Sequence, residues 1–154
     1  MVRENIDDID VRILEILQRD ATRSLESISD EAGVSLNTCW RRVQKLESAG
    51  IIRRRVALVD NEKIGLPFTV FVSIRTDNHS RDWAEQFSRT VNMIPEIVEF
   101  YRLAGDVDYI MKIMVASVSD YDRVYQRLIR DIQILDVSAS FAMEKLKFTT
   151  ELPL

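Results

Sequence analysis

The sequence predicts an α+β protein of two domains, helical in its first third and built on a β-sheet in the remainder. Two observations lead to this prediction. Residues 24–50, SLESISDEAGVSLNTCWRRVQKLESAG, hold two short helical patterns joined by a glycine. Residues 67–150 show patterns in the order strand, helix, strand, strand, helix, strand, which is typical of a ferredoxin-like βαββαβ domain. We expect the first domain over residues 1–58, a linker over 59–66 and the second domain over 67–154.

The stretch around this glycine has the spacing of a helix-turn-helix. Ser24 is suited to cap the start of one helix, and Gly33 is suited to end it in a left-handed conformation. Ser35 begins a second helix that Gly50 ends, with only Val34 between the turn and the new cap. Helices joined so closely must cross steeply, as the two helices of a helix-turn-helix do.

The second of these helices has one apolar and one polar face. At about 100° per residue, Cys39, Val43 and Leu46 fall within one narrow arc. The opposite side holds Asn37, Arg41, Gln44, Lys45 and Ser48, with Thr38 and Arg42 at its flank. Asn can pair bidentately with adenine and Arg with guanine in the major groove, and the first residues of such a helix usually do the reading.

We therefore predict that this helix binds double-stranded DNA. The residues expected to read bases are Asn37, Thr38 and Arg41. The residues expected to bind the phosphate backbone are Ser35, Arg42, Lys45, Arg53, Arg54 and Arg55. A polar, basic helix face can also simply be solvated, but the glycine turn with its two flanking caps favours DNA binding.

The net charge of −4 is unusual for a protein that binds DNA, so the distribution of charge matters. Residues 1–60 carry 10 basic and 11 acidic side chains, whereas residues 40–56 hold six basic side chains against Glu47 alone. The positive charge is therefore local. A local basic patch is sufficient, because affinity depends on the phosphates that are neutralised and falls with salt.

Two further elements complete the N-terminal region. Apolar residues at three- and four-residue steps predict a first amphipathic helix that reaches about Gln18; they are Ile6, Ile9, Ile13, Ile16 and Leu17. Residues 51–60, IIRRRVALVD, are rich in β-branched residues and predict a strand that serves as a wing or linker. Asp60 is expected to cap one short turn that ends at Gly65, and Pro67 marks a boundary.

The second domain is expected to be a four-stranded antiparallel sheet with two helices on one face. The predicted strands are residues 67–76, 96–103, 108–115 and 134–150, and the predicted helices are residues 80–94 and 117–132. Val70, Val72 and Ile74 share one side of the first strand. The face without helices is expected to carry Phe71, Tyr101, Tyr109, Met111 and Phe141, and pairing of two sheets in a homodimer would bury it.

The sequence offers no chemistry for an enzyme. It has no cluster of His, Cys and carboxylates at metal spacing, no glycine-rich phosphate loop and no nucleophile with an evident partner, so neither a metal nor a catalytic site is expected. Lone His79 is expected to be a solvated loop residue, and Cys39 a buried core residue. Without a membrane span or a secretory signal, the protein is placed in the cytoplasm.

Two motifs together resemble a known family. The segment VSLNTCWRRVQKLESAGII and the element AGDVDY at 104–109 are similar to those of the Lrp/AsnC, or feast/famine, transcriptional regulators of bacteria and archaea. The resemblance covers essentially the whole chain. The segments LNTCWRRVQKLE and SASFAMEKLKFTTELPL are most similar to the DecR-like, cysteine-responsive branch of that family.

The resemblance implies a homodimer formed through the C-terminal domain, further homo-oligomers, and a small amino-acid effector that alters assembly or DNA affinity. The implied effector-binding residues are Ala104, Gly105, Asp106, Asp108 and Tyr109. Gly105 permits a tight turn whose amides can bind a carboxylate, Asp106 or Asp108 can accept from an ammonium group, and Tyr109 can close one side. Ala-Gly-Asp is, however, also an ordinary hairpin connection.

Two other functions fit parts of the sequence. A ferredoxin-like metabolite-binding module could regulate a protein partner, with the helical unit used for docking, but this leaves the six basic residues of 40–56 unexplained. RNA binding on the sheet would use Phe100, Tyr101 and Tyr109, but little positive charge accompanies them.

Overall fold

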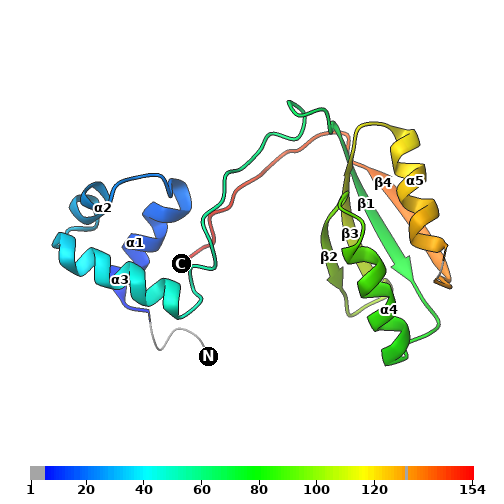
Figure 1. The fold of residues 1–154 in the computed structure, drawn as a ribbon, viewed down its shortest axis with the longest axis horizontal. Coiled ribbons are helices and arrows are strands. Elements are labelled where there is room, and N and C mark those ends of the chain that lie inside the picture. The colour runs from blue at the N-terminus through cyan, green and yellow to red at the C-terminus, as the bar shows by residue number, and fades with distance from the viewer. Residues whose placement is uncertain (1–5, 131) are drawn as a thin grey trace. The chain divides into compact units, whose positions relative to one another are not determined.

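The computed structural model describes residues 6–130 and 132–154, and it divides the chain into two compact units. The first unit comprises Met1–Leu58 together with Leu146–Leu154, and the second comprises Val59–Lys145 (Figure 1). The chain therefore passes between the two units twice. The boundaries predicted from the sequence assigned residues 146–154 to the second domain, whereas their contacts group them with the first unit.

Three helices form the first unit: α1 (Asp8–Arg19), α2 (Leu25–Ala32) and α3 (Leu36–Ser48). The predicted caps are confirmed, because Ser24 Oγ accepts the N–H of Ser27 and Ser35 Oγ accepts the N–H of Thr38. Gly33 ends α2 with φ of 68°, in the left-handed region that favours glycine. The buried core of this unit consists of Ile13, Leu14, Ile16, Ile28, Ala32, Cys39, Val43 and Leu46.

The segment after α3 is not a strand. Residues 53–60 have no regular secondary structure and are exposed, so the strand predicted to serve as a wing or linker is wrong. Its β-branched residues favour extended backbone, but a strand exists only where a neighbouring strand completes its hydrogen bonds. The following turn is as predicted, since Asp60 Oδ1 accepts the N–H of Glu62 at 3.1 Å and the turn ends at Gly65.

The second unit is an antiparallel sheet with strand order β2-β3-β1-β4, covered by two helices. The strands are β1 (Phe68–Arg75), β2 (Ile97–Arg102), β3 (Tyr109–Val115) and β4 (Asp136–Phe141), and the helices are α4 (Arg81–Asn92) and α5 (Val118–Ile129). This is the predicted ferredoxin-like arrangement. The last strand is shorter than the predicted 134–150, and position 131 of the predicted second helix lies outside the described residues.

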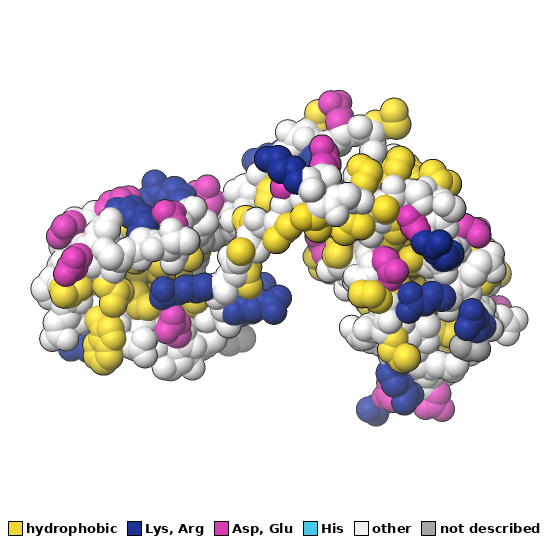
Figure 2. All heavy atoms as spheres, turned by 45° about the horizontal axis from the view of Figure 1, so that its top comes forward, with side chains coloured by type: hydrophobic (Ala, Val, Ile, Leu, Met, Phe, Trp, Pro, Cys, Tyr) yellow, Lys and Arg dark blue, Asp and Glu magenta, His cyan; other side chains and the backbone are white. Residues whose placement is uncertain are grey.

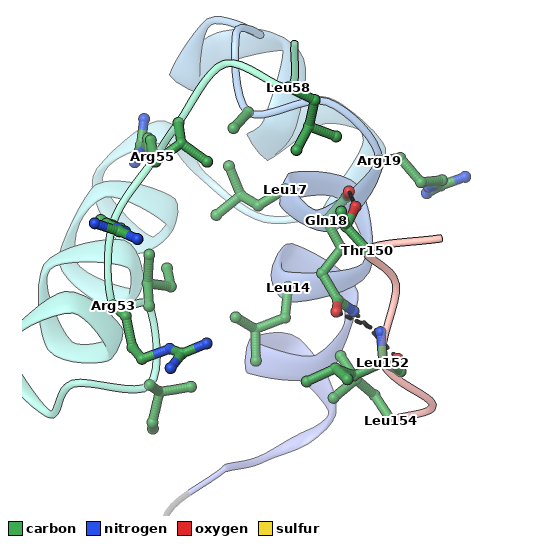
Figure 3. Close-up of a pocket in the computed structure, with 15 residues that line it drawn as sticks. Leu14, Leu17, Gln18, Arg19, Arg53, Arg55, Leu58, Thr150, Leu152 and Leu154 are labelled. Carbon is green, nitrogen blue, oxygen red and sulfur yellow. Dashed lines mark hydrogen bonds between the residues drawn. The ribbon is translucent and has the colours of Figure 1, made fainter. Parts of the chain in front are cut away.

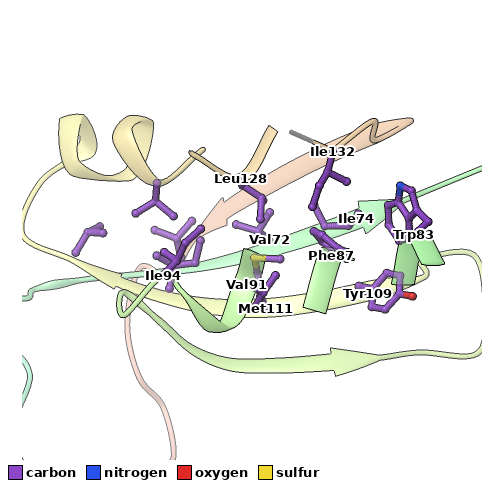
Figure 4. Packing of buried hydrophobic residues seen from close by; sticks show 14 residues of the cluster. Val72, Ile74, Trp83, Phe87, Val91, Ile94, Tyr109, Met111, Leu128 and Ile132 are labelled. Atoms are coloured by element: carbon purple, nitrogen blue, oxygen red, sulfur yellow. The ribbon is translucent and has the colours of Figure 1, made fainter. Parts of the chain in front are cut away.

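Both helices pack on the same face of the sheet (Figure 4). Trp83, Phe87 and Val91 of α4 and Val124 and Leu128 of α5 join the sheet residues in a single buried cluster. The Trp83 indole N–H also donates to the carbonyl of Gln133 at 3.0 Å, so the polar edge of this buried ring has a partner.

The predicted distribution of residues between the two sheet faces needs correction. Tyr109, Met111 and Phe141 lie on the helix-covered face, because strand register places them opposite Ile74, Val72 and Val70 respectively. Tyr109 and Met111 are buried, and the Phe141 ring packs 5.5 Å from that of Tyr121 on α5. Residues directly opposite one another share a face, and register cannot be read from one strand alone.

Phe71 and Tyr101 do occupy the uncovered face, as predicted. Phe71 pairs with Lys112 and Tyr101 with Ile110, which alternate with the buried positions of β3. Both aromatic side chains are exposed. This face is mixed in character, since Lys112 Nζ binds Glu99 Oε1 at 3.0 Å and the Tyr101 hydroxyl donates to Glu99 Oε2 at 3.0 Å.

Candidate nucleic-acid interface and ligand turn

The first turns of α3 present polar side chains to solvent. Asn37 and Arg41 are exposed, and within the described part of the chain neither has a recorded hydrogen bond or ion pair. Thr38 is half-buried, and its hydroxyl accepts from Ser35 Oγ at 2.9 Å. Ser35 is therefore engaged in capping the helix. Asn37 and Arg41 retain their full hydrogen-bonding capacity for a ligand.

Arg42 and Lys45 are committed to contacts within the unit. Arg42 Nη1 lies 2.6 Å from Asp7 Oδ2 and 3.3 Å from both carboxylate oxygens of Asp10, while Lys45 Nζ lies 3.2 Å from Asp10 Oδ2. Asp10 is fully buried and Arg42 is largely buried. The helix wheel placed Arg42 at the flank of the polar face, and that flank packs on α1. Arg42 thus forms a structural ion pair, and its role as a phosphate ligand stays a prediction.

The pKa values of this cluster reflect the same contacts. The N–H of Asp10, followed by the Arg42 guanidinium, holds the pKa of Asp7 below its usual range, and Asp7 in turn raises the pKa of Arg42. Asp7 is also the N-cap of α1, where its carboxylate accepts the N–H groups of Ile9 and Asp10. One carboxylate thus fixes the start of α1 and the flank of α3.

The three arginines after α3 lie away from the reading residues. Arg53, Arg54 and Arg55 line a groove that also involves α1, and Arg53 and Arg55 lie on one wall of it (Figure 3). Arg55 Nη2 forms an ion pair with Glu47 Oε1 at 3.0 Å. Arg53 and Arg54 are exposed, and neither forms a hydrogen bond or an ion pair within residues 6–130 and 132–154.

Sequence reasoning missed an exposed tryptophan beside the reading residues. Trp40 is 52% exposed on α3, and it borders a hollow together with Leu36, Asn37 and Leu25. Since Leu36 is exposed as well, the start of α3 carries an apolar surface next to Asn37. The available signal was the position of Trp40 on the wheel, between the apolar arc and Asn37.

Basic side chains on the first unit are interspersed with acidic ones. Figure 2 shows dark blue Lys and Arg beside magenta Asp and Glu on the face in view, without one continuous basic surface. This agrees with the salt bridges of Arg19 and Arg23 to Glu31 and of Arg55 to Glu47. The charge available to DNA is therefore smaller than the six basic residues of 40–56.

The connection between β2 and β3 in the second unit is an exposed turn. Gly105 has φ of 154°, which side-chain-bearing residues rarely adopt, and a Cβ built there would meet nothing within 4 Å. Ala104 and Asp106 are exposed beside it. The turn is closed by the N–H of Leu103, which donates to the carbonyl of Asp108 at 2.8 Å. Its tip is therefore open to a small ligand.

Asp108 holds this turn against the end of β1. Asp108 Oδ2 accepts the N–H of buried Thr76 at 2.9 Å, and its own N–H donates to the carbonyl of Ile74 at 3.0 Å. His79 Nδ1 lies 3.9 Å from the second carboxylate oxygen, although His79 itself is exposed as predicted. Asp108 retains one oxygen that faces this histidine.

Tyr109 is not beside the open tip of the turn. Its ring is 8% exposed and stacks on Phe100 at 5.4 Å, with Phe87 at 5.2 Å and Trp83 at 5.9 Å. Tyr109 thus belongs to the core beneath α4, and its part in closing one side of a ligand site stays a prediction. The residues that the structure brings together at the tip are Ala104, Gly105 and Asp106.

Over residues 6–130 and 132–154, no group of three or more His, Cys, Asp or Glu could hold a metal ion. Within the same ranges, none of the helices combines the length and apolar character that a membrane span requires. Burial raises the pKa of the Cys39 thiol, as expected for a core cysteine.

A helix-turn-helix with an exposed polar second helix, joined to a sheet domain with an open glycine turn, defines a DNA-binding regulator with a ligand-binding domain. Residues 6–53 match the family model for a winged helix-turn-helix DNA-binding domain, and residues 69–152 match the model for the Lrp/AsnC ligand binding domain. The chain belongs to the Lrp/AsnC family of transcriptional regulators, which confirms the resemblance seen in the sequence.

Relatives match along nearly the whole chain. It is 52% identical to the glutamate uptake regulatory protein of Zymomonas mobilis over 154 residues, covering 100% of this chain and 93% of that protein. It is 43% identical to the DNA-binding transcriptional activator DecR of Escherichia coli over 150 residues, covering 97% of this chain and 99% of DecR. These relatives regulate transcription, so this chain is a transcriptional regulator and not an enzyme.

Solved structures agree with the fold. An AsnC family transcriptional regulator from Agrobacterium tumefaciens is 51% identical with a TM-score of 0.92, covering 96% of this chain and 97% of that one. A transcriptional regulator from Neisseria meningitidis, in complex with L-Met, is 27% identical with a TM-score of 0.90, covering 96% of both chains. The α+β architecture of two domains is therefore that of the family.

Proposed function

We propose that this regulator recognises its DNA site through Asn37 and Arg41 at the start of α3, and that an amino acid bound at the turn Ala104–Asp106 changes that recognition. The observation that carries the first part is the exposure of Asn37 and Arg41 beside basic neighbours that are already paired. The second part is supported by the Neisseria meningitidis relative, which was solved with L-Met.

Recognition would divide between a few base contacts and a limited number of phosphate contacts. Asn37 suits the N6 and N7 positions of adenine, and Arg41 suits the O6 and N7 positions of guanine. Trp40 adds an apolar surface suited to a thymine methyl group. Arg53 and Arg54 remain for the phosphate backbone, whereas Arg42 and Lys45 serve α1.

Two copies of the chain would read a two-part site. A dimer places two recognition helices about 34–36 Å apart, one helical turn of DNA, on a pseudo-palindromic sequence. The uncovered sheet face with exposed Phe71 and Tyr101 is suited to such pairing, because it is apolar in part and has no helix over it. Higher homo-oligomers fit the same scheme.

The turn Ala104–Asp106 has groups for both ends of an amino acid. Backbone N–H groups around Gly105 can donate to the ligand carboxylate, and the exposed carboxylate of Asp106 can accept from its ammonium group. Asp108 positions the turn through its bond to Thr76. Since the tip is exposed in one copy, a second copy would supply the surface that recognises the ligand side chain.

The surface supplied by the second copy would select the side chain of the ligand, while the turn Ala104–Asp106 binds the groups that all amino acids share. Relatives of this chain are named for glutamate uptake in Zymomonas mobilis and for leucine in Haemophilus influenzae. Glutamate and leucine are therefore among the first ligands to test, together with methionine, from the L-Met complex, and cysteine, from the resemblance to the DecR-like branch. A coupling of about 1–3 kcal/mol would change DNA affinity about 5- to 150-fold.

The test measures DNA binding and ligand binding on the same protein. A thermal-shift screen of the twenty amino acids identifies ligands, because binding only to the folded state raises the melting midpoint. Selection of bound sequences from a random DNA pool, followed by fluorescence anisotropy, gives the site and the affinity with and without each ligand. We expect one sequence class to be enriched and one or a few amino acids to shift its affinity.

Two variants assign the parts. Arg41→Ala is expected to lose base preference at one position in each half-site. The control Arg81→Ala should behave as wild type, because the Arg81 side chain lies on α4 and forms an ion pair with neighbouring Glu85. Asp106→Ala should keep ligand-free DNA binding and lose the response to the amino acid, with exposed Asp122→Ala as control. Unchanged base preference in folded Arg41→Ala would remove Arg41 from the reading set.

A further inference from the structure

A groove of about 700 Å³ crosses the first unit away from the reading face of α3. One wall is α1, with Leu14 and Leu17, and another is the segment after α3, with Ile52, Val56 and Leu58 (Figure 3). The groove is also lined by three residues far away in sequence, Thr150, Leu152 and Leu154. The C-terminal segment of the chain thus forms a third wall of this groove, beside α1.

Gln18 binds the backbone of this segment through both polar atoms of its side-chain amide. The Leu152 N–H donates to Gln18 Oε1 at 2.7 Å, and Gln18 Nε2 donates to the Leu152 carbonyl at 3.3 Å. The Thr150 hydroxyl donates to the Gln18 backbone carbonyl at 3.4 Å. A side-chain amide here satisfies the donor and the acceptor of one peptide residue, as a neighbouring strand would. Such pairing fixes position along the segment, independently of side chains.

The location of Gln18 makes this contact relevant to DNA binding. Gln18 lies in the last turn of α1, and α1 carries Asp10, which binds Arg42 and Lys45 of α3. A displacement of the end of α1 would therefore be transmitted to α3 by the buried carboxylate of Asp10. The segment that contacts Gln18 is joined to β4 of the ligand-binding domain by residues 142–148.

We propose that the end of α1 is a docking site for the chain's own C-terminal segment, Thr149–Leu154, which closes the groove as its third wall, and that the Gln18–Leu152 pairing is a clasp that transmits the ligand state of the second domain to α3. The transmission part rests on the proposed function, because it requires an amino-acid response. The docking part does not. The clasp is a second route between the domains, in addition to the linker after α3.

The docking is tested by hydrogen exchange on the full chain, read by mass spectrometry of the C-terminal peptide. Wild type, Gln18→Ala and the control Glu15→Ala are compared; Glu15 is exposed on the same helix. In Gln18→Ala the Leu152 amide should exchange about tenfold faster, the effect expected for loss of roughly one net hydrogen bond. The α3 peptides should be unchanged, which shows that the unit remains folded. Equal exchange of the C-terminal peptide in wild type and Gln18→Ala would overturn the docking.

The transmission is tested with the same proteins by DNA affinity with and without the amino acid that shifts the wild type. We expect Gln18→Ala to bind the amino acid normally, as measured by thermal shift, and to lose most of the ligand-induced change in DNA affinity. Glu15→Ala should keep that change. If Gln18→Ala shows faster hydrogen exchange of the C-terminal peptide but keeps the wild-type change in DNA affinity, the clasp does not transmit the ligand state. Absence of any response in wild type would contradict the proposed effector instead, while the exchange experiment would still decide the docking.

Discussion

Arg42 lies with its Nη1 atom 3.3 Å from both carboxylate oxygens of Asp10, and the Asp10 side chain has no exposed surface. This pair joins the middle of α3 to the first turn of α1. A buried carboxylate without a partner is costly, so the pair determines how the recognition helix is seated. The consequence is that two residues predicted to touch DNA, Arg42 and Lys45, also hold α3 against α1.

Replacing Asp10 with Ala should destabilise the first unit. Arg42 and Lys45 would lose their shared partner, and the capping N–H of Asp7 would lose its acceptor, so we expect a loss of about 2–4 kcal/mol in the free energy of unfolding. Urea unfolding monitored by circular dichroism measures it. Asp30→Ala, at an exposed position of α2, is the control. A loss no larger than that of the control would show that the buried pair adds no stability.

The acid sensitivity of the first unit should depend on Asp7. Its pKa is lowered chiefly by the Asp10 N–H and then by Arg42, so the folded pKa lies below the unfolded one. The ionised carboxylate therefore stabilises the fold above the usual carboxyl range, and this contribution disappears as pH falls through the folded pKa. We expect Asp7→Asn to lower the melting temperature at pH 7, with a difference from wild type that shrinks progressively towards pH 3. A constant difference over that pH range would contradict the assignment.

The salt dependence of DNA binding should separate paired from available arginines. Arg54→Ala should reduce the slope of log affinity against log salt by about 0.9, the value for one phosphate contact. Arg42→Gln should leave the slope unchanged, because Arg42 already neutralises Asp7 and Asp10. The slopes are compared at a temperature where both variants are folded by circular dichroism. Equal reductions in the two variants would return Arg42 to the phosphate-binding set.

Gly105→Ala should impair the ligand response through backbone strain. The φ of 154° disfavours any side chain, while the space around the position is open, so the cost is conformational and of order 1–3 kcal/mol. We expect weaker amino-acid binding in the thermal-shift assay and little change in ligand-free DNA affinity. Asp122→Ala, at an exposed position of α5, should bind normally. Wild-type ligand binding by Gly105→Ala would place the site elsewhere.

The parts of the fold that sequence reasoning predicted are those specified by local signals. Ser24, Gly33 and Ser35 each act within one helical turn, and the structure confirms all three. The parts that it missed depend on pairing across long separations. Strand register places Tyr109 on the face that the helices cover. Residues 53–60 are not a strand because, among the described residues, no neighbouring strand pairs with them.

The candidate site divides in the same way. Asn37 and Arg41 were identified from the wheel, because solvent exposure follows the helix period. The ion pairs of Arg42 with Asp7 and Asp10 were not identified from the wheel, because these acids lie 35 and 32 residues away in sequence. The docking of Leu152 on Gln18, 134 residues apart, carries no periodic signal at all.

The return of Leu146–Leu154 to the first unit has a consequence for the order in which the protein is made. Synthesis proceeds from the N-terminus, so α1, α2 and α3 leave the ribosome well before the residues that form the third wall of their groove. The helical unit is completed only after the whole sheet domain has emerged. A chain interrupted during translation would carry the recognition helix but lack Thr150 and Leu152, so the finished first unit would occur only in molecules that also possess the ligand-binding domain.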